Sequence, residues 1–240
     1  MIQEDIGGAR PGVADVACLS DLPYRAVVLG SMAEISGWGP FFAVRAEAAP
    51  GPPWRPVRDL VDDPSVLSDR VADVRVSLAA SVRVAASVAQ LGVAARLVAP
   101  SLAVAVHSGR FPAFDVWWRD GLSGAFPLAM SGRSVDTPAE LVDFLRRLVD
   151  AVAVFSVSRQ VLWGNVASAT NGAAVMIGVA RPDLASRAIT VADDLLATPP
   201  LRGTGVRGAD GRFRRRSCCL IYQASPGAGR AGLCGDCVLG

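Results

Sequence analysis

Residues 63–106 decide the fold class of this chain: DPSVLSDRVADVRVSLAASVRVAASVAQLGVAARLVAPSLAVAV. Asp63 followed by Pro64 is typical of a helix start, because Asp is a favoured N-cap and Pro fits the first helical position. The residues that follow are mainly small and apolar, which indicates buried helices. Gly92 and Pro100 are expected to interrupt them, since both residue types disfavour a helix interior. The stretch therefore predicts two or three consecutive helices.

Segments on both sides of this stretch also predict helices. Residues 13–35 carry apolar side chains at mixed helical spacing and indicate one or two helices. Thr137 to Glu140 combines a capping box with a proline at the first helical position. An apolar face follows it at Leu141, Phe144, Leu145, Leu148 and Val152. Residues 183–197 predict another amphipathic helix, which ends before a pair of prolines.

Strand signals are few. Residues 115–119 and 125–130 are short apolar or aromatic runs on either side of a Gly-containing loop, which predicts a hairpin. Residues 37–56 contain five prolines and predict a loop whose aromatic side chains pack against the body. The Gly- and Arg-rich residues 201–211 predict a linker. The pattern as a whole predicts an α+β fold that is predominantly α-helical, with a small β-hairpin or sheet.

Length and composition limit the possible classes of protein. With 240 residues, 51% of them hydrophobic, the chain can form one large domain or two small ones. The formal net charge of +2 indicates neither a nucleic acid nor a membrane surface as partner. The acidic first residues lack the apolar core of a secretory signal, and the longest uncharged stretch, residues 160–180, is too polar for a membrane span. We therefore expect a cytoplasmic protein without a membrane span.

Four of the five cysteines lie close to the C-terminal end. Cys218 and Cys219 are adjacent, 14 residues follow them, and Cys234 and Cys237 form a CxxC motif. In a reducing cytoplasm such a group indicates metal or redox chemistry rather than disulfides. Four thiolates are the ligand set of a [2Fe-2S] cluster or of a structural zinc ion, so the count alone leaves both possible.

The spacing of the cysteines favours the cluster. Zinc sites usually take each ligand pair from a turn with two to four residues between the cysteines, and here only the second pair does so. Adjacent Cα atoms are about 3.8 Å apart and their side chains diverge on a strand, so the chain must bend at Cys218 and Cys219 for both sulfurs to face one centre. A binuclear cluster offers two metal atoms to such a pair.

Three other features are weaker candidates for chemistry. Cys18 lies in an apolar, helical stretch and is expected to be a small buried residue rather than a ligand. His107, the single histidine, precedes Ser108 and Gly109 at a predicted helix end, where a capping role is favoured over metal binding. Residues 227–232 match G-x-G-x-x-G but lack the strand, the helix and the acidic residue that a dinucleotide site requires.

The C-terminal sequence resembles a known family. Residues 214–222, RRRSCCLIY, and residues 232–238, GLCGDCV, are similar to the C-terminal end of the FhuF-like ferric siderophore reductases. The resemblance spans roughly residues 60–240, because further similar segments lie upstream at residues 84–96, 116–128 and 162–168. The number of residues between the two cysteine pairs is larger here than is usual in the family, and a Gly-rich insertion of this kind can loop out at little cost.

The resemblance implies a cofactor, an activity and a division of the chain. It implies that Cys218, Cys219, Cys234 and Cys237 bind a [2Fe-2S] cluster, with no catalytic residue beyond the cluster. It implies one-electron reduction of siderophore-bound Fe(III) to Fe(II), which releases iron in the cytoplasm. The substrate would be a ferric siderophore, and electrons would come from an external donor such as a ferredoxin or its reductase. Residues 1–200 would form a helical siderophore platform, and residues 201–240 a linker and the cluster-binding segment.

Two groups of residues near these motifs have two interpretations each. Arg212, Arg214, Arg215 and Arg216 are either a solvated basic segment or a set of cations that raises the reduction potential of the cluster and attracts an acidic donor or an anionic siderophore. Residues 163–165, Trp-Gly-Asn, either line the substrate cleft or mark a buried Trp beside a tight backbone approach.

Two other functions remain alternatives at this stage. The first is a non-enzymatic iron-sulfur or structural zinc protein, in which the four cysteines only fix the C-terminal segment. The second is an accessory protein of siderophore biosynthesis, because the helical part of the family also resembles part of the synthetases that condense siderophore building blocks. The chain has no nucleotide-binding motif, which argues against synthetase activity itself.

Overall fold

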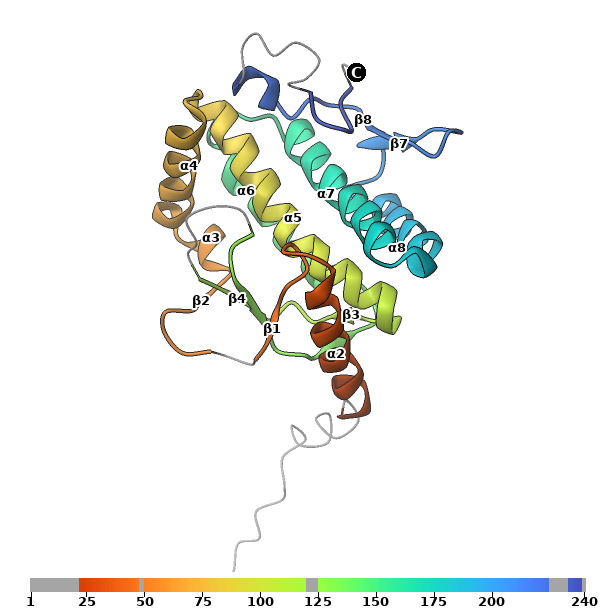
Figure 1. The fold of residues 1–240 in the computed structure, drawn as a ribbon. Helices are drawn as coiled ribbons and strands as arrows, with labels where there is room; N and C mark the ends of the chain where they lie inside the picture. Colours follow the sequence, from red (N-terminus) through yellow and green to blue (C-terminus); the bar gives the residue numbers. More distant parts are fainter. Residues whose placement is uncertain (1–21, 48–49, 120–124, 225–232, 239–240) are drawn as a thin grey trace, which may run out of the picture.

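The computed structural model describes residues 22–47, 50–119, 125–224 and 233–238, and Figure 1 shows their arrangement. Long helices make up most of the described chain, and short strands lie beside them, so the predicted helix-rich α+β class is confirmed. The helices are α2 (Leu22–Ile35), α3 (Asp59–Asp62), α4 (Pro64–Leu78), α5 (Val82–Ser108), α6 (Ala139–Ala153), α7 (Arg159–Ala180) and α8 (Ala185–Ala197), with 3-10 turns η1 (Ser36–Trp38), η2 (Pro182–Leu184) and η3 (Ile221–Ala224).

The central helix is α5. It begins at the N-cap Ser81, whose hydroxyl accepts a hydrogen bond from the N–H of Val84, and it ends at Gly109, which has a φ of 83° in the left-handed region. The predicted helix end at Gly109 is confirmed, but the predicted breaks at Gly92 and Pro100 are wrong. Pro100 lies inside the helix and is buried. Neighbouring elements cover α5 on most sides, and this burial outweighs the intrinsic cost of the two residues.

By length and composition, α5 is the one described helix that could cross a membrane. In its most apolar window, however, 78% of the residues are buried inside the protein. Such burial is typical of the core helix of a folded domain, and it explains why the sequence of α5 is apolar on every face.

Helix α7 runs beside α5 in the same direction (Figure 1). The Nε2 of Gln90 on α5 donates a 3.3 Å hydrogen bond to the carbonyl of Leu162 on α7, which fixes the register near the starts of both helices. Farther along, small residues such as Ala95, Ala99 and Gly172 face the space between the two helices. Helices α2, α4, α6 and α8 pack around this pair.

The outer helices follow the sequence prediction, with one difference in capping. Asp63 caps α4 by accepting from the N–H of Ser65, as its sequence predicts. Helix α6 lies where it is expected, but the predicted capping box is wrong. Instead of capping α6, Glu140 accepts a 2.7 Å hydrogen bond from the N–H of Phe114 and ties α6 to the strand region. Of the predicted helical region 13–35, residues 13–21 lie outside the described part of the chain.

The predicted hairpin forms the centre of a small sheet. Strand β4 (Val116–Trp118) pairs antiparallel with β5 (Leu128–Met130), with Trp117 opposite Ala129. Strands β1 (Arg45–Ala46) and β2 (Arg55–Pro56) extend the sheet in the order β1-β5-β4-β2. A separate pair joins β3 (Phe111–Pro112) to β6 (Ser134–Val135). The structure therefore has more strand pairing than the sequence signals predict, because two-residue strands leave no periodic pattern.

Residues 201–211 do not form an irregular linker. Strand β7 (Gly205–Arg207) pairs antiparallel with β8 (Phe213–Arg215) and makes a second hairpin. Gly205 is required there, since a Cβ at this position would lie 2.2 Å from the ring of Phe213. Arg207 binds Asp193 on α8 at 2.8 Å and holds the hairpin against the helices. The C-terminal segment is thus attached to the helical body before the first cysteine.

One buried cation connects α5 to the sheet. Arg96 is 1% exposed and donates to the carbonyls of Phe126 (2.7 Å), Phe41 (2.8 Å) and Ala43. Burial lowers its pKa to about 10. Because main-chain carbonyls receive its donors, Arg96 fixes the aromatic loop and the hairpin on the central helix.

Candidate metal centre

The C-terminal segment crosses the end of the helical layer at which α5 and α7 begin (Figure 1). All four cysteines of the motif are described there as free thiols. The Sγ atoms of Cys219 and Cys234 are 3.6 Å apart, although 14 residues separate the two cysteine pairs in sequence. Cys219 and Cys237 are buried, whereas Cys218 and Cys234 are partly exposed. The structure thus brings the two halves of the motif together at one place.

The main chain bends immediately after the adjacent pair. Leu220 has a φ of 70°, in the left-handed region that residues with a Cβ rarely adopt. This bend lets the N–H of Leu220 donate to the Sγ of Cys218 at 3.4 Å. The CxxC half forms a turn of its own, in which the N–H of Cys237 donates to the carbonyl of Cys234 at 3.1 Å. A bend at the adjacent cysteines is expected from the sequence, and the structure places it at Leu220.

The thiols influence one another's protonation. The hydrogen bond between the thiols of Cys219 and Cys234 lowers the pKa of Cys219 and raises the pKa of Cys234. The pKa of Cys218 is raised, chiefly by burial, and repulsion from the charged forms of Cys219 and Cys237 adds to the shift.

Among the described residues, no three Cys, His, Asp or Glu side chains are arranged to hold one metal ion. A tetrahedral zinc site needs four ligands around one centre. A [2Fe-2S] cluster instead takes two thiolates on each of its two irons. Cys219 and Cys234 are in contact, and the four cysteines of the motif match the donor set of such a cluster in number.

A buried arginine lies against these thiols. Arg215 is 1% exposed, and its Nη2 lies 3.5 Å from the Sγ of Cys234. Its Nη1 donates to the Oδ1 of Asn165 on α7 at 2.8 Å. Its Nε is buried and has no hydrogen-bond partner. An unpaired buried donor on a cation beside four thiols fits a site that receives a negatively charged group.

Asn165 is itself held by a buried polar network. Its Nδ2 donates to the carbonyl of Ser87 at 3.0 Å and to the Oε1 of Gln90 at 3.0 Å, both on α5. The hydroxyl of Ser87 donates in turn to the carbonyl of Cys219 at 2.8 Å. The network therefore links both central helices to both halves of the cysteine motif. Its polar residues lie near the starts of α5 and α7, where the cysteine segment packs.

A second set of contacts fixes the CxxC turn. Asp236, between Cys234 and Cys237, accepts hydrogen bonds from Ser168 (2.8 Å) and Asn171 (3.3 Å) of α7. Its carbonyl accepts from the N–H of Arg215 at 3.1 Å, which joins the turn to β8. The turn is thus attached to both the helical body and the preceding strand.

Residues 163–165 support the packing of the C-terminal segment against α7 rather than line a cleft. Trp163 is 9% exposed and belongs to the core. A Cβ on Gly164 would lie 2.1 Å from the Oγ of Ser217, so a larger residue would force this hydroxyl of the C-terminal segment to move. Of the second interpretation, the buried Trp is confirmed, whereas the close neighbour of Gly164 is a side chain and not the main chain.

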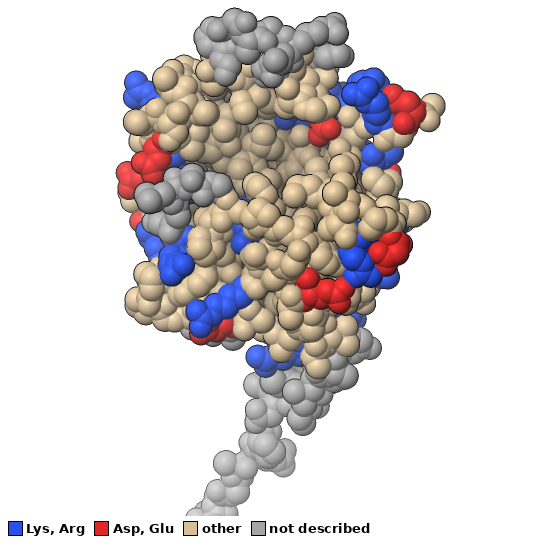
Figure 2. All heavy atoms as spheres, in the orientation of Figure 1, with Lys and Arg blue, Asp and Glu red and all other residues tan. Residues whose placement is uncertain are grey.

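Beyond this centre, a shallow groove of about 170 Å³ lies between α5 and α7. It is lined by Phe41, Leu91, Ala95, Ala99, Ser168, Ala169, Gly172, Ala173 and Met176. Figure 2 shows this face hollowed and largely free of charged side chains, which gather around its edge. Ser168 connects the groove to the cysteine segment, because it lines the groove and also binds Asp236.

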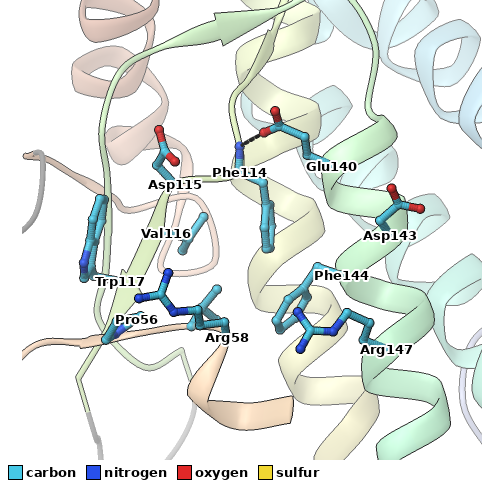
Figure 3. A pocket seen from close by; sticks show the side chains of 11 residues that line it. Pro56, Arg58, Phe114, Asp115, Val116, Trp117, Glu140, Asp143, Phe144 and Arg147 are labelled. Atoms are coloured by element: carbon cyan, nitrogen blue, oxygen red, sulfur yellow. Dashed lines mark hydrogen bonds between the residues drawn. The ribbon is translucent and has the colours of Figure 1, made fainter. Parts of the chain in front are cut away.

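A larger pocket of about 360 Å³ lies elsewhere, between β4, α6 and the β2–α3 region (Figure 3). Phe114, Trp117, Phe144, Arg58 and Arg147 line it together with the Glu140 carboxylate, and none of the four motif cysteines is in its lining. The sequence does not reveal this pocket, because its walls come from segments far apart in the chain. It is not part of the cysteine centre.

The remaining sequence candidates have separate outcomes. Cys18 and residues 227–232 lie outside the described residues. His107 lies in the last turn of α5, and its ring contacts Ser31 at 2.9 Å and Glu34 at 3.1 Å, so it joins α5 to α2. In the arginine run, Arg212, Arg214 and Arg216 are exposed and only Arg215 is buried.

Comparison with known proteins identifies the C-terminal segment. Residues 215–239 match the family model described as FhuF 2Fe-2S C-terminal domain. No curated protein and no solved structure matches the chain. The match begins at the buried Arg215 and includes all four clustered cysteines. Residues 215–239 of this chain are therefore similar to a FhuF-type 2Fe-2S C-terminal domain, and the cofactor is a [2Fe-2S] cluster.

Proposed function

We propose that this protein is a ferric-siderophore reductase, in which Cys218, Cys219, Cys234 and Cys237 bind the cluster. The 3.6 Å approach of Cys219 to Cys234 is the observation that best supports this ligand set, because it joins the two halves of the motif. The match to the FhuF 2Fe-2S C-terminal domain supports a redox role for this segment. When bound, the cluster would supply one-electron transfer.

Reduction is a sufficient mechanism for iron release. Ferric iron is a hard cation that siderophore oxygens hold tightly, and a single electron converts it to the more labile ferrous ion. The reaction consumes one electron per iron and needs no nucleophile or general base. In this proposal the electron comes from an external donor of the ferredoxin class or its reductase.

The partial exposure of Cys218 and Cys234 gives the centre a solvent-facing side. A donor or a ferric chelate can approach there, while Cys219 and Cys237 remain buried. The exposed Arg214 and Arg216 lie next to this side in sequence and offer positive charge to an acidic donor or an anionic chelate.

The helical body supplies the platform for the substrate. We assign the ferric chelate to the uncharged groove between α5 and α7, because Ser168 connects this groove to the CxxC turn through Asp236. In this proposal, residues 1–200 bind the chelate and residues 201–240 hold the cluster. The reaction takes place in the cytoplasm, where a reducing donor and ferrous iron acceptors are present.

The first experiment is anaerobic purification, followed by iron, zinc and acid-labile sulfide analysis. Two irons and two sulfides per chain, with an S = 1/2 paramagnetic signal after dithionite reduction, are expected for one [2Fe-2S] cluster. One zinc without sulfide would overturn the proposal and leave a structural metal site. The second experiment mixes the reduced protein with a ferric siderophore and a ferrous-iron chelator under argon. Cluster reoxidation together with ferrous iron formation is expected, and a cluster that stays reduced would exclude the reductase.

The ligand assignment has its own test. Cys→Ser substitution at any of the four positions should abolish or alter the cluster spectrum. Cys18→Ser is the matched control and should leave the iron and sulfide content unchanged. Equal tolerance at all five positions would contradict the assignment.

A further inference from the structure

The two arginines that are buried in the described part of the chain are satisfied in different ways. Arg96 and Arg215 are each 1% exposed. The guanidinium of Arg96 donates to three main-chain carbonyls, so its donors are used within the fold. The guanidinium of Arg215 contacts one neutral oxygen and cysteine sulfurs, and its Nε is unpaired. The environment of Arg215 is therefore incomplete without a further acceptor.

Arg215 also lacks a carboxylate counter-ion. In the described part of the chain no Asp or Glu forms an ion pair with it, whereas the adjacent Arg214 faces Asp210 at 3.8 Å. Asp236 accepts from the main-chain N–H of Arg215 but directs its carboxylate to Ser168 and Asn171. A buried cation is costly unless a negative charge compensates it. Among the described residues, the candidates beside this guanidinium are the cysteine sulfurs.

The strand geometry explains why only one arginine of the run is in this position. Side chains alternate across a strand, and along β8 Phe213 and Arg215 are buried whereas Arg214 is exposed. Arg216 is exposed on the other side of Arg215. The four arginines of the sequence are therefore not equivalent, and a solvated charge acts on the centre much less than a buried one.

Resting on the proposed cluster ligands, we propose that Arg215 is the internal counter-charge of the [2Fe-2S] cluster, held in place by Asn165, and that it raises the cluster's reduction potential. Reduction adds one negative charge to a centre of thiolates and sulfides that is already negative. A fixed buried cation stabilises the reduced form more than the oxidised form, since water screens it little. Arg215 is thus a positioning residue that acts through the cluster.

Asn165 fixes the position of the Arg215 guanidinium. Its Oδ1 accepts from Arg215, while its Nδ2 is committed to Ser87 and Gln90. The amide therefore cannot rotate without losing the contacts to α5. The register of α5 against α7 consequently fixes the distance of the guanidinium from Cys234.

The test compares the midpoint potential of the wild-type cluster with that of five variants, by redox titration followed by electron paramagnetic resonance. Arg215→Gln removes the positive charge, and Arg215→Lys keeps this charge but loses the planar guanidinium group. Arg214→Gln and Arg216→Gln are matched controls, because they remove an exposed arginine on either side. Asn165→Asp leaves Arg215 unchanged but places a carboxylate against it. Iron and sulfide content are measured for every variant.

Arg215→Gln should lower the equilibrium constant for cluster reduction at least tenfold, which is about 59 mV for one electron. Asn165→Asp should shift the potential in the same direction, and Arg215→Lys should stay closer to the wild type than Arg215→Gln. In the two exposed controls, Arg214→Gln and Arg216→Gln, the equilibrium constant for cluster reduction should change less than twofold. Raising the salt concentration should remove even that small change.

Two results would overturn the proposal for Arg215 alone. The first is a fully loaded Arg215→Gln protein with the wild-type potential. The second is an equal shift in the Arg214→Gln or Arg216→Gln protein, which would indicate only general surface charge. If Arg215→Gln binds no cluster, the Arg215→Lys and Asn165→Asp variants decide the question. A tenfold change in the equilibrium constant for cluster reduction in Arg215→Lys, without such a change in Asn165→Asp, contradicts the proposal. A wild-type protein without iron and sulfide would overturn the proposed function itself.

Discussion

The hydroxyl of Ser168, on α7, donates a 2.8 Å hydrogen bond to the Oδ2 of Asp236, in the middle of the CxxC turn. A residue of the helical body and a residue of the cysteine motif are thus in direct contact, and Asn171 adds a second donor to the same carboxylate. The cysteine segment is consequently part of the folded body rather than an appended tail.

Asp236→Ala should loosen the CxxC turn and accelerate cluster loss. The substitution removes both hydrogen bonds to α7, and hydrogen bonds to charged groups contribute about 1.5–3 kcal/mol each. The measurement is the rate at which a ferrous chelator bleaches the reduced protein. Asp210→Ala is the control, because Asp210 is an exposed acidic residue of the β7–β8 turn. Equal bleaching rates in the two variants would contradict a role for the Asp236 carboxylate.

Gly164→Ala should destabilise the docked C-terminal segment by about 1–3 kcal/mol, the usual cost of overpacking. The new Cβ would lie 2.1 Å from the Oγ of Ser217, a hydroxyl that also donates to the carbonyl of Gln160 at 3.1 Å. Adding Ser217→Ala should restore much of the loss, because the Ser217 Cβ is 3.5 Å away, an ordinary contact. Chemical denaturation measures both variants.

Gly172→Ala is the matched control for the previous substitution. Gly172 lies on the same helix, and a Cβ added there would meet open space, so alanine should be tolerated or stabilise α7 by up to about 1 kcal/mol. If Gly164→Ala and Gly172→Ala have the same free energy of unfolding, the close approach of Ser217 to α7 is not a constraint.

Arg96→Leu should destabilise the whole fold by about 3 kcal/mol or more, because three buried carbonyls lose their donor. The variant should unfold at lower urea concentration with an unchanged slope. Arg83→Leu, at an exposed position near the start of α5, should have little effect. A small effect of Arg96→Leu would mean that water replaces the guanidinium at these carbonyls.

Asp115→Asn should have an effect that depends on pH. Hydrogen bonds from Arg133 (2.6 Å) and then Ser131 (3.0 Å) lower the pKa of Asp115. The carboxylate therefore stabilises the fold fully above the ordinary Asp pKa, and this contribution is lost as the pH falls through the folded-state value. The difference in unfolding free energy between variant and wild type should shrink below about pH 4. Asp143→Asn, in an exposed pair with Arg146, is the control.

Gly172→Leu should block the groove without changing the cluster. Open space surrounds the position, so the leucine side chain can enter the groove between α5 and α7. The rate at which a ferric siderophore reoxidises the reduced cluster should fall at least tenfold, whereas oxidation by ferricyanide and the midpoint potential should not change. Arg58→Ala, in the separate pocket of Figure 3, should alter none of these. Unchanged siderophore turnover in Gly172→Leu would place the substrate elsewhere.

The sequence predicts most long helices and the central hairpin, because their periodicity and caps are local. Asp63 caps α4 and Gly109 ends α5 as expected. The errors arise where tertiary contacts compete with local signals. Pro100 does not end α5, since the helix is buried on most sides, and Glu140 binds Phe114 across 26 residues instead of capping α6.

In the candidate site, too, the sequence predicts one part and the other part depends on tertiary contacts. The four cysteines are visible as a motif, and the match to the family model agrees with them. The special role of Arg215 is not visible, because four neighbouring arginines look alike until the strand alternation of β8 is known. Asn165, Ser168 and Asn171 are polar residues in an otherwise apolar helix, and that anomaly is the signal in the sequence for a docking surface.

The attachment of the cysteine segment also orders events during synthesis. The side chains that receive it, from Ser87 to Asn171, all precede it in the chain, and N-terminal parts fold first as a chain emerges from the ribosome. The receiving surface on α5 and α7 can therefore be complete before the first motif cysteine is made. The cysteine segment then docks onto helices that have already folded.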